Sequence, residues 1–103
     1  MTDSTGPEIR NAPERGRWEA VADGNVVGYA AYRRSPDRLV LTHTVVQPEA
    51  EGEGVGSALA RAALDDARAS DLRVEARCEF MAAWIARHPE YADLTVDVAD
   101  GGR

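Results

Sequence analysis

Two β-like runs of apolar and polar residues come first in the chain, and a third follows closely. Residues 17–34 read RWEAVADGNVVGYAAYRR, with one run on each side of the tripeptide DGN. Asp, Gly and Asn suit the positive backbone dihedral angles of a tight hairpin turn. Residues 38–46, RLVLTHTVV, are rich in β-branched side chains and are followed by Pro48. The pattern therefore predicts three antiparallel strands in a meander.

A helical period replaces this pattern in the second half of the chain. Across residues 56–70, apolar side chains recur at steps of three and four positions, which predicts an amphipathic helix. Residues 72–76, LRVEA, predict a short fourth strand. Residues 78–88, CEFMAAWIARH, predict a second helix that Pro89 interrupts, and LTVDV at 94–98 predicts a last strand.

The predicted order of elements is strand, strand, strand, helix, strand, helix, strand. This order favours an α+β fold with a mixed, mainly antiparallel sheet and two packed helices. Residues 1–16 are polar, contain two prolines and show no period, so we expect a flexible N-terminal tail. With 103 residues in all, the chain is expected to form one domain over 17–98, followed by a short tail at 99–103.

Composition narrows the classes of partner. The formal net charge is −6 and the pI about 4.8, which argue against nucleic acid as the main partner and favour a cationic substrate. Cys78 is the one cysteine, and no Cys/His cluster has metal-ligand spacing, so neither a disulfide nor a metal site is expected. No signal peptide or membrane-spanning run is recognisable, so we expect a cytoplasmic protein without a membrane partner.

The stretch EGEGVGSALA, residues 51–60, places glycines at 52, 54 and 56 directly before the first predicted helix. Unpaired N–H groups in such a loop, together with the helix dipole, form a site for an anion. The glycine spacing differs from the dinucleotide fingerprint, and no Gly-Lys-Ser/Thr follows as in nucleoside triphosphate loops. An ordinary turn that caps the helix is the alternative interpretation of these glycines.

Two motifs carry a resemblance to a known family. VVQPEAEGEGVGSALARAAL resembles the acetyl-coenzyme A pyrophosphate loop of the GCN5-related N-acetyltransferase superfamily. CEFMAAWIARHPEY resembles the ending of a small single-domain branch of that superfamily, so the likeness spans about residues 17–98. It implies acetyl-coenzyme A as cofactor, with a backbone N–H near Val45 or Val46 polarising the thioester carbonyl. The cofactor-binding residues that it implies are Val45, Val46, Gly52, Glu53, Gly54, Val55, Gly56 and Ser57.

Two acids flank the proposed anion site. Glu51 stands where the superfamily usually has Gln or Arg, and Glu53 adds a second carboxylate. Like charges about 6 Å apart cost roughly 2–3 kcal/mol at an effective dielectric constant near 20. The two side chains must therefore point away from a bound pyrophosphate. Strict alternation along the loop would place both of them on one side, opposite the glycine amides.

His43 and Cys78 are the candidate catalytic residues. By the period-two rule His43 shares a strand face with Leu41 and Val45, and histidine is a residue type that can take up a proton at neutral pH, which suits a general base. The alternative for His43 is a half-buried histidine whose nitrogens bond to the backbone. Cys78 opens the second helix, and the resemblance implies that it lies near the acyl end of the cofactor as acceptor or proton donor. A small buried apolar side chain is the alternative for Cys78.

The remaining marked residues have structural interpretations. Phe80, Met81 and Trp84 are expected to pack in the core. In the sequence HPEY, His88 is expected to cap helix carbonyls and Tyr91 to lead the chain back to the sheet. Arg33 and Arg34 are expected at a solvated strand end, or against the 3′-phosphate of the cofactor.

These observations predict an acetyl-coenzyme A-dependent N-acetyltransferase whose acceptor is an amine of a protein, a peptide or a small molecule. The small size of the domain leaves little chain for a wall around the acceptor, so we expect an exposed site or one completed by a second subunit. The expected state is a monomer or a homodimer. A non-catalytic module that senses acyl-coenzyme A or binds another protein is the alternative, and the two loop acids favour it.

Overall fold

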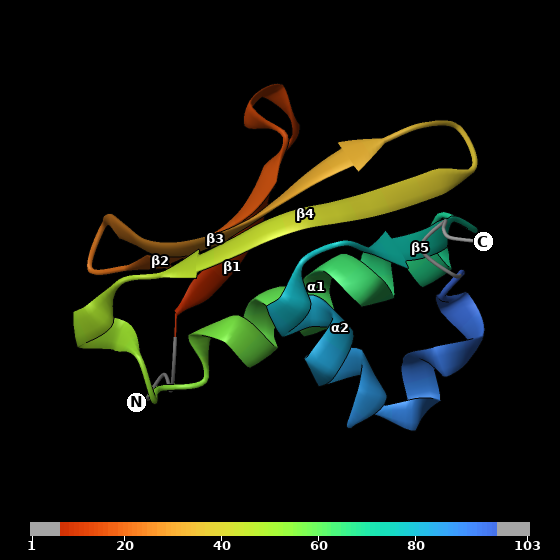
Figure 1. Ribbon diagram of the computed structural model, residues 1–103. Coiled ribbons are helices and arrows are strands. Elements are labelled where there is room, and N and C mark those ends of the chain that lie inside the picture. The colour runs from red at the N-terminus through yellow and green to blue at the C-terminus, as the bar shows by residue number, and fades with distance from the viewer. Residues whose placement is uncertain (1–6, 97–103) are drawn as a thin grey trace.

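The computed structural model describes residues 7–96 as a single sheet with helices packed on one side (Figure 1). The strands and helices, in chain order, are β1 Glu8–Ala12, β2 Arg17–Ala22, β3 Asn25–Arg34, β4 Arg38–Val46, α1 Val55–Ala69, β5 Arg73–Ala76 and α2 Glu79–Ala86. Short 3-10 helices span Pro13–Arg15, Pro48–Ala50 and Pro89–Leu94. The predicted α+β class, its three-strand meander and its two α-helices are confirmed.

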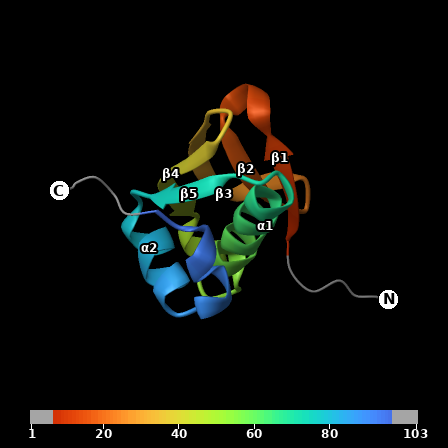
Figure 2. The ribbon, with the colours of Figure 1, turned by 90° about the vertical axis from the view of Figure 1, so that its right-hand side faces the viewer.

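The strands lie side by side in their chain order, β1-β2-β3-β4-β5. All neighbours are antiparallel except β4 and β5, which are parallel because α1 crosses over between them. The DGN turn joins β2 to β3 with positive φ at Asp23 and Gly24, as the sequence predicts. Figure 2 shows that α1 and α2 cover the same side of the sheet. We call that side the helix face and the opposite side the open face.

The two ends of the domain differ from the expectation. Glu8–Ala12, placed by the sequence in a flexible tail, pair with β2 over their whole length. Ile9 packs against the core and Ala12 is buried, but two apolar residues in a polar segment are too few to reveal a strand. At the other end, the predicted strand 94–98 is reduced to one parallel bridge between Thr95 and Val74. Residues 97 and 98 of that strand, and the predicted 99–103 tail, lie outside the described residues.

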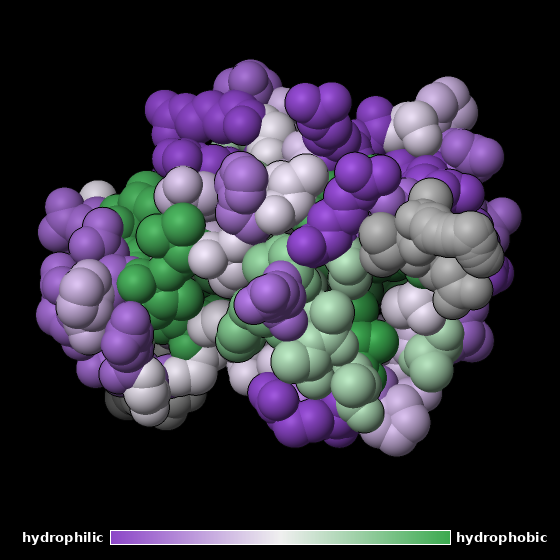
Figure 3. Space-filling model, viewed as in Figure 1, coloured by the Kyte–Doolittle hydropathy of each residue, from purple (hydrophilic) through white to green (hydrophobic). Residues whose placement is uncertain are grey.

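The hydrophobic core lies between the helix face and the two helices. Its largest fully buried side chains are Trp84, Leu41, Leu59, Leu64, Met81 and Val74. The margin of the molecule above the sheet, on the side away from the helices, is mainly hydrophilic (Figure 3). No helix within residues 7–96 is long and apolar enough to cross a membrane.

Strand β4 carries an irregularity that decides where its side chains point. Leu41 pairs with Tyr32 and His43 pairs with Ala31, so one step along β3 matches two steps along β4. The extra residue makes a β-bulge at Thr42. A bulge of one residue reverses the alternation of side chains beyond it, because the side-chain period of a strand is two.

Candidate active site

A gap opens between β4 and β5 halfway along β4. Strand β5 pairs only with residues 38–41 and ends at Ala76 (Figure 1). There the N–H groups of Arg77 and Cys78 both donate to the carbonyl oxygen of Leu41, at 2.9 and 3.1 Å, and the chain leaves the sheet for α2. The rest of β4 therefore has no strand neighbour on that side among the described residues.

The direction of the backbone amides along this free edge follows from one hydrogen bond. The N–H of Gln47 donates to the carbonyl oxygen of Val27 at 2.8 Å, so Gln47 points toward β3. Along a strand, successive backbone N–H groups point to opposite sides. The N–H of Val46 therefore points away from β3, into the gap, and the N–H of Val45 points toward β3. Of the two residues that the resemblance implied as carbonyl donors, Val46 has the geometry for it.

The glycine loop presents unpaired N–H groups beside the gap. Gly52 and Gly54 adopt left-handed conformations, with φ of 86° and 81°, and Gly54 caps α1. The N–H of Glu53 donates to Ala50 at 3.3 Å, but the amides of Gly52 and of 54–57 bond to no other described residue. Five donors therefore converge near a helix N-terminus, where the dipole adds positive charge.

A pocket of about 400 Å³, which we call the loop pocket, connects this loop to the gap. Its lining residues are Thr44, Val46, Ala50, Glu51, Gly52, Gly54, Val55, Gly56, Ser57 and Phe80. Phe80 is 38% exposed and lies against Gly56, so its predicted place in the core is wrong. A Cβ on Gly56 would lie 2.6 Å from the Phe80 ring, so only glycine admits the ring in this position.

The two loop acids do not share a side. Glu51 lines the loop pocket, whereas Glu53 lines a different pocket together with Pro7 and Glu49. The expectation that both point the same way is wrong, because the left-handed Gly52 between them turns the chain and breaks the alternation. One of the two acidic residues, Glu51, therefore lines the pocket of the unpaired amides.

Cys78 lies at the N-cap of α2, as predicted, and is half-buried. Its Sγ donates a hydrogen bond to the Oγ1 of Thr44 at 3.3 Å. Thr44 also lines the loop pocket, so this bond places the thiol next to that pocket. Sequence reasoning missed Thr44, because uninterrupted alternation puts it on the face opposite Leu41.

His43 is exposed on the open face. Leu41 is 1% exposed and faces the helices, and Thr44 also faces them through its contact with Cys78. The two residues between them, Thr42 and His43, both point to the open face. His43 was expected to share a strand face with Leu41 and Val45. It does not share one with Leu41, because the bulge lies between the two residues. Its role as a base stays a prediction.

The HPEY segment attaches α2 to α1. Trp84 is 1% exposed, stacks on His88 at 3.6 Å between ring centroids, and donates from Nε1 to Ser57 Oγ at 3.0 Å. His88 Nδ1 lies 2.7 Å from the Trp84 carbonyl oxygen, in agreement with its predicted capping role. Tyr91 donates to Asp65 at 2.7 Å, and burial raises the pKa of its phenol. These contacts join α2 and the segment after it to α1, at Ser57 near the start of α1 and at Asp65 further along it.

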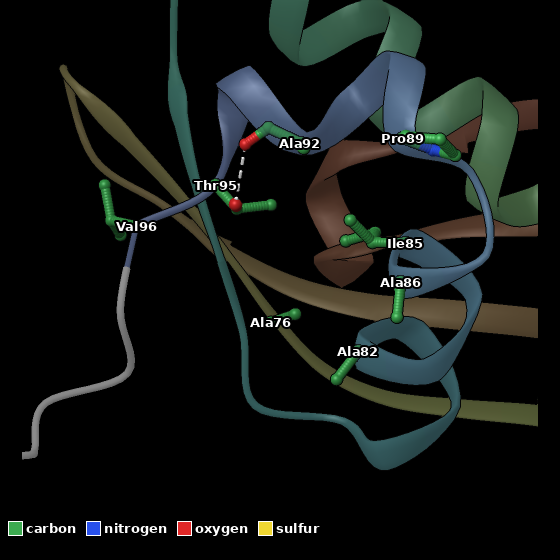
Figure 4. A pocket seen from close by; sticks show the side chains of 8 residues that line it. All are labelled: Ala76, Ala82, Ile85, Ala86, Pro89, Ala92, Thr95 and Val96. Atoms are coloured by element: carbon green, nitrogen blue, oxygen red, sulfur yellow. Dashed lines mark hydrogen bonds between the residues drawn. The ribbon is translucent and has the colours of Figure 1, made fainter.

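A second pocket of about 400 Å³, bounded by α2, the end of β5 and the last 3-10 helix, is almost wholly apolar (Figure 4). Among residues 7–96, Thr95 is the one lining residue whose side chain has a hydrogen-bonding group, and its Oγ1 already donates to Ala92 at 2.9 Å. The described part of the lining therefore offers no acid or base for chemistry. Within residues 7–96, no group of three His, Cys, Asp or Glu could hold a metal ion.

The open face holds two buried carboxylates, each between two arginines. Glu75 accepts hydrogen bonds from Arg77 and from Arg38, the latter at 3.1 Å. Glu19 is held in the same manner by Arg17 and Arg15, at 2.8 and 3.1 Å. The hydrogen bond from Arg77 holds the pKa of Glu75 below its usual value, and that from Arg17 does the same for Glu19. Both acids therefore stay ionised at neutral pH.

Arg33 and Arg34 point to opposite faces. Arg34 reaches Asp66 on α1 at 3.5 Å, on the helix side. Arg33 pairs in register with Val40, on the open face. Neither residue lines the loop pocket, so the structure gives no support to their predicted contact with a 3′-phosphate.

Comparison with known proteins places this geometry in context. A model of the family GCN5-related N-acetyl-transferase matches residues 17–94. A candidate GCN5-like N-acetyltransferase from Staphylococcus aureus, solved by NMR, has a similar structure, with a TM-score of 0.68 and 24% identity over 91% of this chain and 92% of that one. A ribosomal-protein-alanine N-acetyltransferase from Brucella melitensis biovar Abortus gives a TM-score of 0.60 and 16% identity over 84% of this chain and 64% of that one. No curated protein matches the chain.

Proposed function

Because the chain belongs to the GCN5-related N-acetyl-transferase family, and so to the acyltransferases, we propose that it transfers an acetyl group from acetyl-coenzyme A to an amine. One observation carries the proposal. The loop pocket joins unpaired glycine-loop amides to the free edge of β4 and reaches Thr44, the hydrogen-bond partner of Cys78. One pocket thus has in its lining both the glycine loop with its unpaired amides and the hydrogen-bond partner of the Cys78 thiol.

The residues of the loop pocket fit a diphosphate with an extended arm. The N–H groups of Gly52 and of 54–57 are free to hold the phosphate oxygens. Gly52 and Gly54 leave their side of the loop open, since a Cβ on either would meet no atom within 4 Å. Val46 offers its amide along the path to Cys78. When bound, acetyl-coenzyme A would supply the acetyl group as an activated thioester.

The chain's own residues divide the proton transfers between the two faces of β4. The amide of Val46 stabilises negative charge that develops on a carbonyl oxygen in the gap. On the helix face, Cys78 holds a proton at Sγ, directed by Thr44, that it gives to the departing sulfur. On the open face, His43 takes the proton that the amine loses. The C–N bond of the amide would form as the thioester C–S bond breaks, after which His43 releases its proton to solvent and Cys78 takes one up from solvent.

Calorimetry with coenzyme A tests the first half of the proposal. We expect saturable binding to the full chain, and a thermal stabilisation that grows with ligand, about 2.7 kcal/mol at 100 times the dissociation constant. Titration with pantetheine, which lacks the diphosphate, is the control and should bind far more weakly. The absence of heat and of stabilisation at millimolar coenzyme A would refute the loop as a pyrophosphate site.

Replacement of the two loop acids sharpens this test. Glu51→Gln removes the negative charge of the acidic residue that lines the loop pocket, so coenzyme A should bind about tenfold more tightly. Glu53→Gln is the matched control, because this residue lines a different pocket and should change the affinity little. Equal effects of the two variants would contradict the assigned positions.

A non-catalytic sensor of acyl-coenzyme A is the second candidate, favoured by the acidic residue Glu51 in the lining of the loop pocket. Mass spectrometry separates the two. An enzyme transfers acetyl from acetyl-coenzyme A to an added amine, and Cys78→Ser slows that transfer. A sensor binds acetyl-coenzyme A but releases no free thiol when an amine is added.

A further inference from the structure

We propose that the acceptor is an amine that also carries a carboxylate, and that an arginine-lined pocket on the open face holds that carboxylate. This inference rests on the proposed function and names the class of its acceptor. It comes from a pocket that the sequence motifs do not mark, from the charges around it, and from its place beside the β4–β5 gap.

The pocket has a volume of about 460 Å³ and is lined by Arg33, Val40, Thr42 and Arg77, which we call the arginine pocket. Arg33 and Val40 are cross-strand partners on β3 and β4, and Val40 is in turn the partner of Glu75 on β5. Leu39 and Leu41, on either side of Val40, are buried under the helices, so Val40 points to the open face. The floor of the arginine pocket is thus the open face of the sheet.

The arginine pocket lies at the start of the gap, across β4 from the loop pocket. Arg77 comes immediately before Cys78, at the point where β5 leaves β4. Thr42 is the bulge residue, and the next residue, His43, points to the same face. The base is therefore on the side of the arginine pocket, whereas Thr44 and Cys78 are on the side of the loop pocket. An acceptor seated over Arg33 and Arg77 would have its amine near His43 and the gap.

The charge of this face is positive although the chain as a whole carries −6. The strand pairings place on this face the residues Arg10, Arg17, Arg33, Arg38, Arg73 and Arg77, against Glu8, Glu19 and Glu75. Two of these acids, Glu19 and Glu75, are already shared between pairs of arginines. Arg33 forms no ion pair with any residue in the described part of the chain. Its guanidinium is therefore available for a carboxylate of a ligand.

This distribution reverses the expectation from net charge. A chain of charge −6 favoured a cationic substrate, but net charge averages over the whole surface. The acids gather elsewhere, as with Glu49, Glu51 and Glu53 around the glycine loop. A guanidinium binds a carboxylate in a bidentate manner, which fixes the orientation of the rest of the molecule. A cationic acceptor would instead meet Arg33 and Arg77 as like charges.

Binding can be tested without turnover, on the full chain saturated with coenzyme A. The probes are three dipeptides with a free α-amine and an amidated C-terminus, Glu-Glu, Gln-Gln and Lys-Lys. In NMR titrations we expect Glu-Glu to shift the resonances of Thr42, His43 and Arg77 and to bind about tenfold more tightly than Gln-Gln, with Lys-Lys weakest. The preference should shrink as salt is added.

Two adjacent arginines supply a matched pair of variants. Arg33→Glu reverses the charge in the arginine pocket and should abolish the preference for Glu-Glu over Gln-Gln. Arg34→Glu makes the same change one residue away, where the side chain faces α1 and Asp66, and should keep the preference. Circular dichroism melting of both variants checks that each is folded, and Arg33→Gln replaces Arg33→Glu if the latter is not.

The second measurement is the rate of acetyl transfer to the same dipeptides. Free glutamate is tested beside them, because it distinguishes a small-molecule acceptor from a peptide acceptor. Higher kcat/KM for acidic amines supports the inference. Equal or better binding of Gln-Gln or Lys-Lys, or equal effects of Arg33→Glu and Arg34→Glu, would overturn it. Failure of the proposed function is seen separately, because coenzyme A binding is measured before any dipeptide is added.

Discussion

The two faces of strand β4 contrast sharply in what they offer. On the helix face, Leu39 and Leu41 are buried, and Thr44 contacts the thiol of Cys78. On the open face, Val40 forms the floor of the arginine pocket and His43 is exposed. A nine-residue strand therefore separates a hydrophobic, thiol-bearing side from a polar, basic side. In the proposed function, the helix face of this strand would therefore serve the acyl donor and the open face the acceptor.

The bulge at Thr42 creates this contrast at the right point along β4. Without it, His43 would face the helices beside Leu41, and Thr44 would lie among the arginines. One inserted residue thus exchanges the faces of every position from 43 to 46. The exchange occurs where β5 ends, so the reversed half of β4 is also the half with a free edge.

The largest expected effect concerns the base on the open face. His43→Gln should lower kcat/KM for acetyl transfer by about 10²- to 10⁴-fold, because the amine loses its proton acceptor. Coenzyme A affinity and melting temperature should not change, since His43 is exposed and lies across the strand from the loop pocket. Steady-state kinetics and calorimetry measure the two. A twofold loss or less would remove His43 from the mechanism.

The second prediction tests the two faces through stability. Leu41→Ala should reduce the free energy of unfolding by about 2–5 kcal/mol, because a fully buried side chain leaves a cavity. His43→Ala, two residues along the same strand, should change it by about 0.5 kcal/mol or less. Urea denaturation measures both variants. Comparable losses would show that the two side chains share a face and that the bulge is absent.

A smaller effect is expected from added volume on β3. A Cβ on Gly28 would lie 2.9 Å from Val55 Cγ1 and 3.0 Å from the Val45 carbonyl oxygen, so Gly28→Ala should destabilise the fold by about 1–3 kcal/mol. Ala31→Val enlarges a half-buried side chain of the same strand on the open face, which no helix covers, and should be close to neutral. Thermal unfolding of both variants compares them. Equal losses would contradict the uncovered state of the open face.

The smallest expected effect is a change in how steeply the free energy of unfolding depends on pH. Hydrogen bonds from Arg77 and Arg17 lower the pKa of Glu75 and Glu19 in the folded state, so the unfolded chain binds more protons as the pH falls below about 4.5. Stability is therefore kept above that pH and lost below it. Glu75→Gln should flatten this dependence in urea titrations between pH 6 and 3. Glu49→Gln, an exposed acid without an ion pair in residues 7–96, should leave the slope as it is.

Local sequence patterns were sufficient to predict the elements that bury a continuous row of apolar side chains or form a short turn. The period of α1, the DGN hairpin and the β-branched run of β4 are each specified by neighbours within a few residues. The glycine spacing likewise marked the loop that leaves its amides unpaired. Strand β1 escaped detection because its pairing comes from β2 rather than from its own composition.

The sequence by itself determined the class of fold, the glycine loop before α1 and the placement of Cys78 at a helix start, because each depends mainly on residues close in the chain. Only the tertiary structure decided which face His43 and Thr44 occupy, that Phe80 lies over Gly56, and that Arg33 and Arg77 line one pocket. The register between β3 and β4 sets the first of these outcomes, the packing of α2 on α1 sets the second, and the pairing of β5 with β4 brings Arg77 to the pocket of Arg33. Register is a relation between two strands, and a single extra residue in one of them reverses every side chain beyond it.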